Sequence, residues 1–102
     1  MEHDLSDLKL FLDREGRLTA LPAKHKKKLA ALWYLAGKIE AGRQYSEPEI
    51  NALLDEWALF HDHATFRREL YNKGLLNRTA DCSRYWKAET IPALAAFIAS
   101  HV

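Results

Sequence analysis

The stretch from Tyr45 to Lys87 decides the fold, and it reads YSEPEINALLDEWALFHDHATFRRELYNKGLLNRTADCSRYWK. Ser46 and Glu49 form a capping-box sequence, and Pro48 falls in the first turn, where its missing N–H costs no hydrogen bond. Apolar residues then recur at helical spacing: Ile50, Leu53, Leu54 and Trp57. We therefore predict a helix that follows the capping box and ends near Phe60.

A second helix is predicted from about His63 to Lys73. Asp62 is placed to cap it, and Phe66 and Leu70 have the spacing of a core-facing stripe. Gly74 follows in the C′ position, where glycine commonly ends a helix.

Two short strand-like runs, 75–78 and 84–87, flank the small and polar residues 79–83, which favours a hairpin. Helix, turn, helix and basic hairpin is the order of a winged helix-turn-helix, an architecture that reads nucleic acids and has also been adapted to bind proteins. The predicted fold is mainly α with a small β-hairpin, a winged helix-turn-helix-like single domain. The helix-turn-helix would span about 46–74 and the hairpin wing about 75–87.

Upstream, we predict a short helix over 4–11, a turn over 13–16, an extended piece over 17–21, and a long helix from about Ala23 to Glu40 that Gly42 closes. The long helix has a predicted buried stripe: Leu29, Leu32, Trp33, Ala36 and Ile39. Its first turns hold the tract KHKKK, residues 24–28, at the end where the helix dipole favours acids. Solvation explains such a charge run, and a role in phosphate contact is the alternative.

A last helix is predicted over about 91–100, with Thr90 as its cap and Pro92 in its first turn. Its residues, IPALAAFIAS, carry no charge, and a helix that is apolar nearly all round must be covered by its own domain or by a second subunit. A homodimer through this helix is therefore one expectation.

Composition bounds the class of protein. The chain has 102 residues, enough for one domain with one core. No apolar run approaches the ~18 residues of a membrane span, and the charged N-terminus is not a secretory signal. One cysteine leaves no intramolecular disulfide and suits the cytoplasm. The net charge of +1 argues against an indiscriminate nucleic-acid binder, but basic residues flank the acidic segment 45–61, so one face can still be positive.

The second helix of the quoted stretch carries candidate base contacts. Arg67, Tyr71 and His63 recur at spacings of four and would share an exposed face. In a major groove, Arg67 could bond guanine bidentately, and Asn72 could read adenine or a phosphate.

Arg67 and Arg68 are both candidate nucleic-acid contacts, but adjacent residues point about 100° apart on a helix and cannot share one task. We expect one arginine to bind nucleic acid. The other, Arg68 by preference, would pair with Glu47 or Glu49 on the preceding helix.

Basic residues of the hairpin and of the long upstream helix are the candidate phosphate contacts: Lys24, Lys27, Lys28, Arg78 and Arg84. On a hairpin, such residues touch phosphate or the minor groove, as wings do. Lys87 of the hairpin could touch DNA in the same way. The alternative for the three hairpin residues is that they only keep the exposed strands soluble. Arg17 could add a phosphate contact or hold its own loop by bonding carbonyls.

Metal, cofactor and catalytic sites are not predicted. The cluster 61–63, HDH, together with Cys82 has metal-ligand types, but two histidines at i, i+2 across a helix start do not converge easily. Cys82 has no evident cationic helix terminus to activate it as a thiol sensor. The glycines are too scattered for a phosphate-cradling loop, and no nucleophile elbow or catalytic carboxylate pair stands out. We therefore expect no enzyme, and we read Trp33, Trp57 and Trp86 as core or interface anchors.

Several separated motifs resemble a bacterial domain-of-unknown-function family over nearly all of residues 8–87. They are Gly16-Arg17 with Pro22 and Lys24, Tyr45-Ser46-Glu47 with Glu49, Ile50 and Asn51, Phe66-Arg67-Arg68-Glu69-Leu70, Gly74-Leu75-Leu76 with Arg78, and Tyr85-Trp86. That family is winged-helix-like and is found alone or appended to helix-turn-helix transcription regulators of the arsenic-repressor type, so the resemblance implies a regulatory role and no catalytic residues. One departure is the wing tip, where the family often has an acidic residue and Gly, and this chain has Asp81-Cys82.

The sequence thus predicts a cytoplasmic bacterial DNA-binding or transcription-regulatory domain. The alternative is a winged-helix-shaped protein-interaction or ligand-sensing module that does not bind nucleic acid. The near-zero net charge and the acids Asp55 and Glu56 favour this alternative, because phosphate repels acids.

Overall fold

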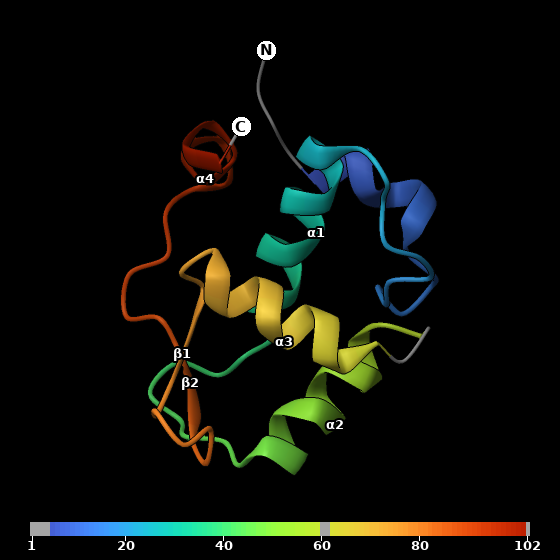
Figure 1. The fold of residues 1–102 in the computed structure, drawn as a ribbon. Helices are drawn as coiled ribbons and strands as arrows, with labels where there is room; N and C mark the ends of the chain where they lie inside the picture. Colours follow the sequence, from blue (N-terminus) through green and yellow to red (C-terminus); the bar gives the residue numbers. More distant parts are fainter. Residues whose placement is uncertain (1–4, 60–61, 102) are drawn as a thin grey trace.

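The computed structural model describes residues 5–59 and 62–101 (Figure 1). Its elements are the 3₁₀ helix η1 (Leu5–Phe11), α1 (His25–Ala36), α2 (Glu47–Trp57), α3 (His63–Asn72), β1 (Leu76–Arg78), β2 (Tyr85–Lys87) and α4 (Leu94–His101). The predicted fold class is confirmed: the chain is mainly helical with one antiparallel hairpin, a layout consistent with a winged helix. No helix in the described ranges is long and apolar enough to cross a membrane.

Helix α1 is the centre of the packing, since it contacts η1, α3 and α4 (Figure 1). Of the predicted stripe, Leu29, Leu32, Ala36 and Ile39 are buried, whereas Trp33 is half-buried. Ala30, Ala31 and Leu35 are buried as well. A single stripe was too narrow a prediction because neighbours cover α1 on several sides.

The ends of α1 differ from the predicted 23–40. At its start Lys24 is extended and makes no side-chain capping bond. At its end the N–H groups of Lys38 and Ile39 donate to the carbonyls of Leu35 and Ala36, so the chain tightens into turns after residue 36. Gly42, at φ +78, lies in the loop that follows and does not end the helix.

Helix α2 begins with the predicted capping box. Glu49 N–H donates to Ser46 Oγ at 3.3 Å, and Ser46 N–H donates to Glu49 Oε1 at 2.8 Å. The helix ends at Trp57 because Ala58 turns extended and pairs with Leu18, whose N–H donates to the Trp57 carbonyl at 2.7 Å. The predicted end near residue 60 lies outside the described residues.

Helix α3 buries Phe66 and Leu70, as predicted. Asp62 occupies its N-cap position, but the expected side-chain cap is wrong, since no such bond forms. At the other end Gly74 has φ +77, its N–H donates to the Tyr71 carbonyl, and Leu75 N–H donates to the Leu70 carbonyl. This pair of bonds is a Schellman motif, which turns the chain sharply into β1.

The hairpin pairs Leu76 with Lys87 and Arg78 with Tyr85. Tyr45, just before α2, exchanges both backbone hydrogen bonds with Tyr85, at 2.7 and 2.8 Å. The segment before α2 thereby joins the hairpin, and α3 contacts β1.

Helix α4 starts later than predicted, at Leu94, so Thr90 and Pro92 lie in the preceding loop and do not cap it. The Pro92 carbonyl accepts a hydrogen bond from Trp33 Nε1 at 2.9 Å. Helix α4 packs on α1 and buries Leu94, Phe97 and Ile98, so the chain itself covers the apolar side. The opposite side carries exposed small residues: Ala95, Ala96, Ala99 and Ser100.

Candidate nucleic-acid interface

A hollow of about 260 Å³ opens between α3 and the hairpin, and we call it the α3–hairpin hollow. Its lining is Ala64, Arg67, Arg68, Tyr71, Asn72, Arg78, Cys82 and Tyr85. The lining residues in the described part of the chain include three arginines and no acid. Of the nine predicted contacts, the structure gathers Arg67, Arg68, Tyr71, Asn72 and Arg78 at this one surface.

Arg67 joins three elements of the fold. Its Nη1 donates to Asn51 Oδ1 and lies 3.2 Å from Glu47 Oε1, both on α2. Its guanidinium carbon lies 5.7 Å from the ring centroid of Tyr85 on β2. Only 20% of the side chain is exposed, so Arg67 is largely committed to holding α3 against α2 and β2.

Arg68 is exposed and makes no ion pair with any described residue. The preference for Arg68 as the arginine that pairs with α2 is therefore wrong, and Arg67 takes that place. The predicted exposed face is wrong for His63 and Arg67, because His63 lies with Arg67 on the α2 side and its Nδ1 is 3.0 Å from Asp55. Tyr71 is exposed, as predicted. Residues at i, i+3, i+4 and i+7 form the packed face of α3, and Arg68 lies about 100° away from Arg67.

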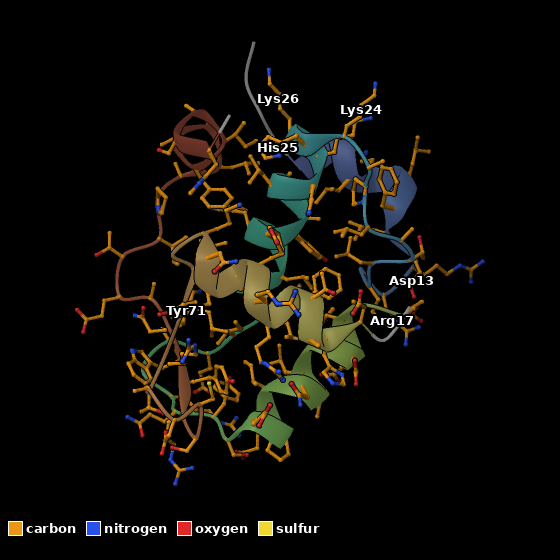
Figure 2. The ribbon with its side chains drawn as sticks, in the orientation of Figure 1. Asp13, Arg17, Lys24, His25, Lys26 and Tyr71 are labelled. Atoms are coloured by element: carbon orange, nitrogen blue, oxygen red, sulfur yellow. The ribbon has the colours of Figure 1, made fainter. Side chains whose placement is uncertain are left out.

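Tyr71 and Asn72 are exposed beside Arg68. Tyr71, labelled in Figure 2, is 42% exposed, and the Arg78 guanidinium lies 4.4 Å from its ring centroid. This stacking links the open side of α3 to β1 and fixes the position of Arg78.

Arg78 is also anchored in the hairpin. Its Nη1 donates to the Thr79 carbonyl at 3.1 Å and to Cys82 Sγ at 3.2 Å. Burial, together with a hydrogen bond to the Cys82 side chain, raises the pKa of Tyr85, which keeps this phenol neutral. Cys82 and Tyr85 were not predicted as site residues. The cross-strand position of Tyr85 opposite Arg78 could have indicated its place, once the register was known.

The hairpin tip is organised by Asp81. Its Oδ1 accepts bonds from the Ser83 and Thr79 hydroxyls, both at 2.7 Å, and from Ser83 N–H at 3.1 Å. These bonds, the Ser83 hydroxyl first, lower the pKa of Asp81 to about 2. Cys82 follows at φ 61, a conformation that favours glycine. Arg84 is exposed at this tip and does not line the hollow.

The lysines of α1 are divided between two places. Lys28 Nζ lies 3.9 Å from Glu69 Oε2 on α3, and Lys73 Nζ lies 3.8 Å from the same atom. Lys28 therefore flanks α3. Lys24 lies at the far end of α1 from the hairpin (Figure 2) and is not brought to the hollow, while Lys27 is half-exposed one residue before Lys28.

The acids of α2 are largely used inside the molecule. Glu47 pairs with Arg67, Asp55 with His63, and Glu49 belongs to the capping box. The Ser46 backbone N–H, followed by its hydroxyl, lowers the pKa of Glu49. Only Glu56 is exposed without a partner in the part of the chain that is described. The acidic character of this helix is therefore mostly structural.

Arg17 holds its loop, but through carboxylates where carbonyls were expected. Its Nε lies 2.9 Å from Asp13 Oδ2 and its Nη2 lies 3.2 Å from Glu15 Oε2, far from the hairpin (Figure 2). Among the described residues, no three His, Cys, Asp or Glu side chains come close enough to hold a metal ion, and residue 61 lies outside that range.

Comparison with known proteins gives one match. No curated protein and no solved structure matches the sequence. Residues 17–87 match the family "Uncharacterized protein conserved in bacteria (DUF2087)", so the match begins later than the residue 8 inferred from the motifs. It includes α1, α2, α3 and the hairpin, with every lining residue of the α3–hairpin hollow. The chain belongs to this bacterial family, DUF2087.

Proposed function

We propose that this protein is a cytoplasmic DNA-binding, transcription-regulatory domain that binds DNA through the open side of α3 and the adjacent hairpin. One observation supports it above the others. Arg68, Tyr71 and Asn72 on α3 open onto the same surface as Arg78 on β1, and no described lining residue there is acidic.

Base contacts would come from Arg68 and Asn72. These residues are four apart, so they lie on one side of α3 with an axial separation of about 6 Å. That separation is close to two base-pair steps of about 3.4 Å each, so the two side chains would address base pairs two steps apart. Arg reads guanine and Asn reads adenine through paired hydrogen bonds in the major groove.

Phosphate contacts would flank this helix on both sides. Arg78 and Arg84 extend from the hairpin, and Lys27 and Lys28 extend from α1. Glu69 offsets part of the lysine charge, because both Lys28 and Lys73 lie within 4 Å of it. Lys24 would contribute only where the DNA extends past the end of α1.

A regulatory role follows from the resemblance to domains appended to arsenic-repressor-type regulators. In such a role the domain would act as a dimer, since half-sites on DNA commonly match a two-fold protein. The exposed alanines on the outer side of α4 allow a second copy to approach closely. A monomeric mass by sedimentation equilibrium at tens of micromolar would overturn the dimer.

Fluorescence anisotropy with a random-sequence DNA duplex at low and moderate salt tests DNA binding. We expect binding that weakens steeply with salt, because phosphate contacts release counterions. Arg84→Ala should make the negative slope of log K against log salt shallower by about 0.9, the value for one phosphate contact. Arg14→Ala, an exposed arginine on a remote loop, is the matched control. No binding at micromolar protein in low salt would overturn the proposal.

A ligand-sensing module is the second candidate function. The α3–hairpin hollow favours it, because a concave surface lined by three arginines suits a small anion as well as DNA.

A further inference from the structure

We propose that the α3–hairpin hollow binds a phosphate group, held by the guanidinium groups of Arg67 and Arg78. The phosphate could belong to a small phosphorylated compound or to a nucleic-acid backbone. The inference does not depend on DNA binding, since a free phosphate compound would satisfy it alone.

Both guanidinium groups are held through one nitrogen only. Arg67 uses Nη1 for Asn51 and Glu47, and Arg78 uses Nη1 for Thr79 and Cys82. In the described ranges, Nε and Nη2 of these two arginines have no hydrogen-bond acceptor. No fully buried side-chain nitrogen or oxygen there lacks a partner, so these unpaired N–H groups are at least partly exposed. The Nε/Nη2 edge is a fork that bonds an oxyanion bidentately.

Aromatic rings hold the two forks before any ligand arrives. Arg78 stacks on Tyr71 at 4.4 Å, and Arg67 lies over Tyr85 at 5.7 Å. Such contacts limit the rotamers of a long side chain, so less entropy is lost when an anion binds. The Tyr rings also cover one side of each guanidinium, where water would otherwise weaken its interaction with an anion.

The charge and size of the hollow fit a phosphate. Three arginines line it, and Glu47 beside Arg67 offsets one of their charges, which leaves an excess of positive charge for a divalent anion. Asn72 adds an amide at the edge. The volume of about 260 Å³ lies just below the ~300 Å³ that begins the usual range for drug-sized ligands, so a small anion is favoured.

The test is a nuclear magnetic resonance titration of the full chain with inorganic phosphate and then pyrophosphate, at ionic strength held constant with sodium chloride. The side-chain Nε–H signals of Arg67 and Arg78 should shift and saturate, while those of Arg14 and Arg43 should not. Arg43 is a matched control because it stacks on Tyr45 at 4.6 Å outside the hollow.

Arg78→Lys keeps the charge and removes the fork, so the affinity for pyrophosphate should fall about tenfold, the loss that one charge-assisted hydrogen bond accounts for. Arg43→Lys should leave that affinity unchanged. If Arg78→Lys fails to fold, the titration of the native chain decides alone. Linear shifts without saturation, or equal shifts at Arg43, would overturn the proposal.

A final arm adds a short DNA duplex. If DNA shifts the Arg67 and Arg78 signals itself and removes the effect of phosphate, the bound phosphate is that of the backbone. If phosphate still shifts both signals after the duplex is added, or if the duplex does not bind to the protein, the ligand is a free phosphate compound. Either result supports the phosphate site. If phosphate shifts neither signal but DNA still binds, the phosphate site is overturned and the DNA-binding proposal stands.

Discussion

Helices α2 and α3 pack against each other, but they differ in whether their charged side chains are paired within the molecule. On α2, Glu47, Glu49 and Asp55 are each paired within the molecule. On α3, Arg67 is paired in the same way, but Arg68 next to it is exposed and faces the α3–hairpin hollow. In the proposed function, the open side of α3 makes the contacts with DNA, while α2 supports α3 and holds it in position.

The packed sides of the two helices should respond alike to truncation, and this is the largest effect expected. Leu54 on α2 and Leu70 on α3 are fully buried, so each change to Ala should lower the free energy of unfolding by about 2–5 kcal/mol. Urea denaturation measures both. Asn72→Ala, on the open side of α3, should change that free energy by less than about 0.5 kcal/mol. A comparable loss of stability in Asn72→Ala would contradict the view that only one side of α3 is packed.

Arg67 and Arg68 give the sharpest test of the contrast. Arg67→Ala leaves Asn51 and Glu47 without their donor, so the free energy of unfolding should fall by about 1–3 kcal/mol. Arg68→Ala should change stability by less than about 0.5 kcal/mol.

In DNA binding the order should reverse, with Arg68→Ala weakening binding by about 1–3 kcal/mol if it contacts a base. Urea denaturation ranks the two variants by loss of stability, and fluorescence anisotropy ranks them by loss of DNA affinity. Greater destabilisation by Arg68→Ala than by Arg67→Ala would contradict the assignment.

These two arginines also show where the sequence was sufficient and where it was not. Helical spacing and caps located α2, α3 and the hairpin, because apolar periodicity, Ser46 and Gly74 act locally. The prediction that one arginine is structural was right, but which one depends on how α3 is rotated against α2. That rotation follows from tertiary packing, which spacing within one helix does not encode. The end of α2 at Trp57 has the same origin, since Leu18 pairs with Ala58 across a long sequence separation.

The capping box of α2 should contribute less than its packing. Ser46→Ala removes the hydroxyl that accepts from Glu49 N–H, so the free energy of unfolding should fall by about 1 kcal/mol. Because the pKa of Glu49 is lowered in the folded state, its contribution is present above the ordinary value of 4.5 and is lost as pH falls below it. Glu49→Gln isolates this contribution, because glutamine does not ionise while the Ser46 backbone N–H is kept. Urea denaturation at neutral pH and at progressively lower pH should show the difference between the native chain and Glu49→Gln shrink in acid. A constant difference would mean that the Glu49 carboxylate is not part of the cap.

The hairpin tip should lose its order at still lower pH. The pKa of Asp81 is lowered from 3.8 to about 2, so its bonds to Thr79 and Ser83 are kept above pH 3.8 and lost as pH falls through about 2. The amide signal of Ser83 should follow this titration in nuclear magnetic resonance spectra. Asp81→Asn keeps an acceptor oxygen and removes the ionisation, so the Ser83 signal should then be flat over the same range. A midpoint near 3.8 in the native chain would show that the tip does not hold the carboxylate.

Cys82→Gly should have only a small effect on stability, because relief of backbone strain is offset by two losses. Cys82 has φ 61, where a side chain costs about 1–2 kcal/mol and glycine costs none. Glycine gives back roughly 0.5–1 kcal/mol through the greater freedom of the unfolded chain, and the half-buried thiol contact to Arg78 is lost. The net change in the free energy of unfolding should therefore be within about 0.5 kcal/mol. Arg78 keeps its bond to the Thr79 carbonyl and its stacking on Tyr71, so DNA affinity should also be unchanged. A loss of DNA affinity in a variant that remains folded would instead identify the thiol as the anchor that holds Arg78 toward the open side of α3.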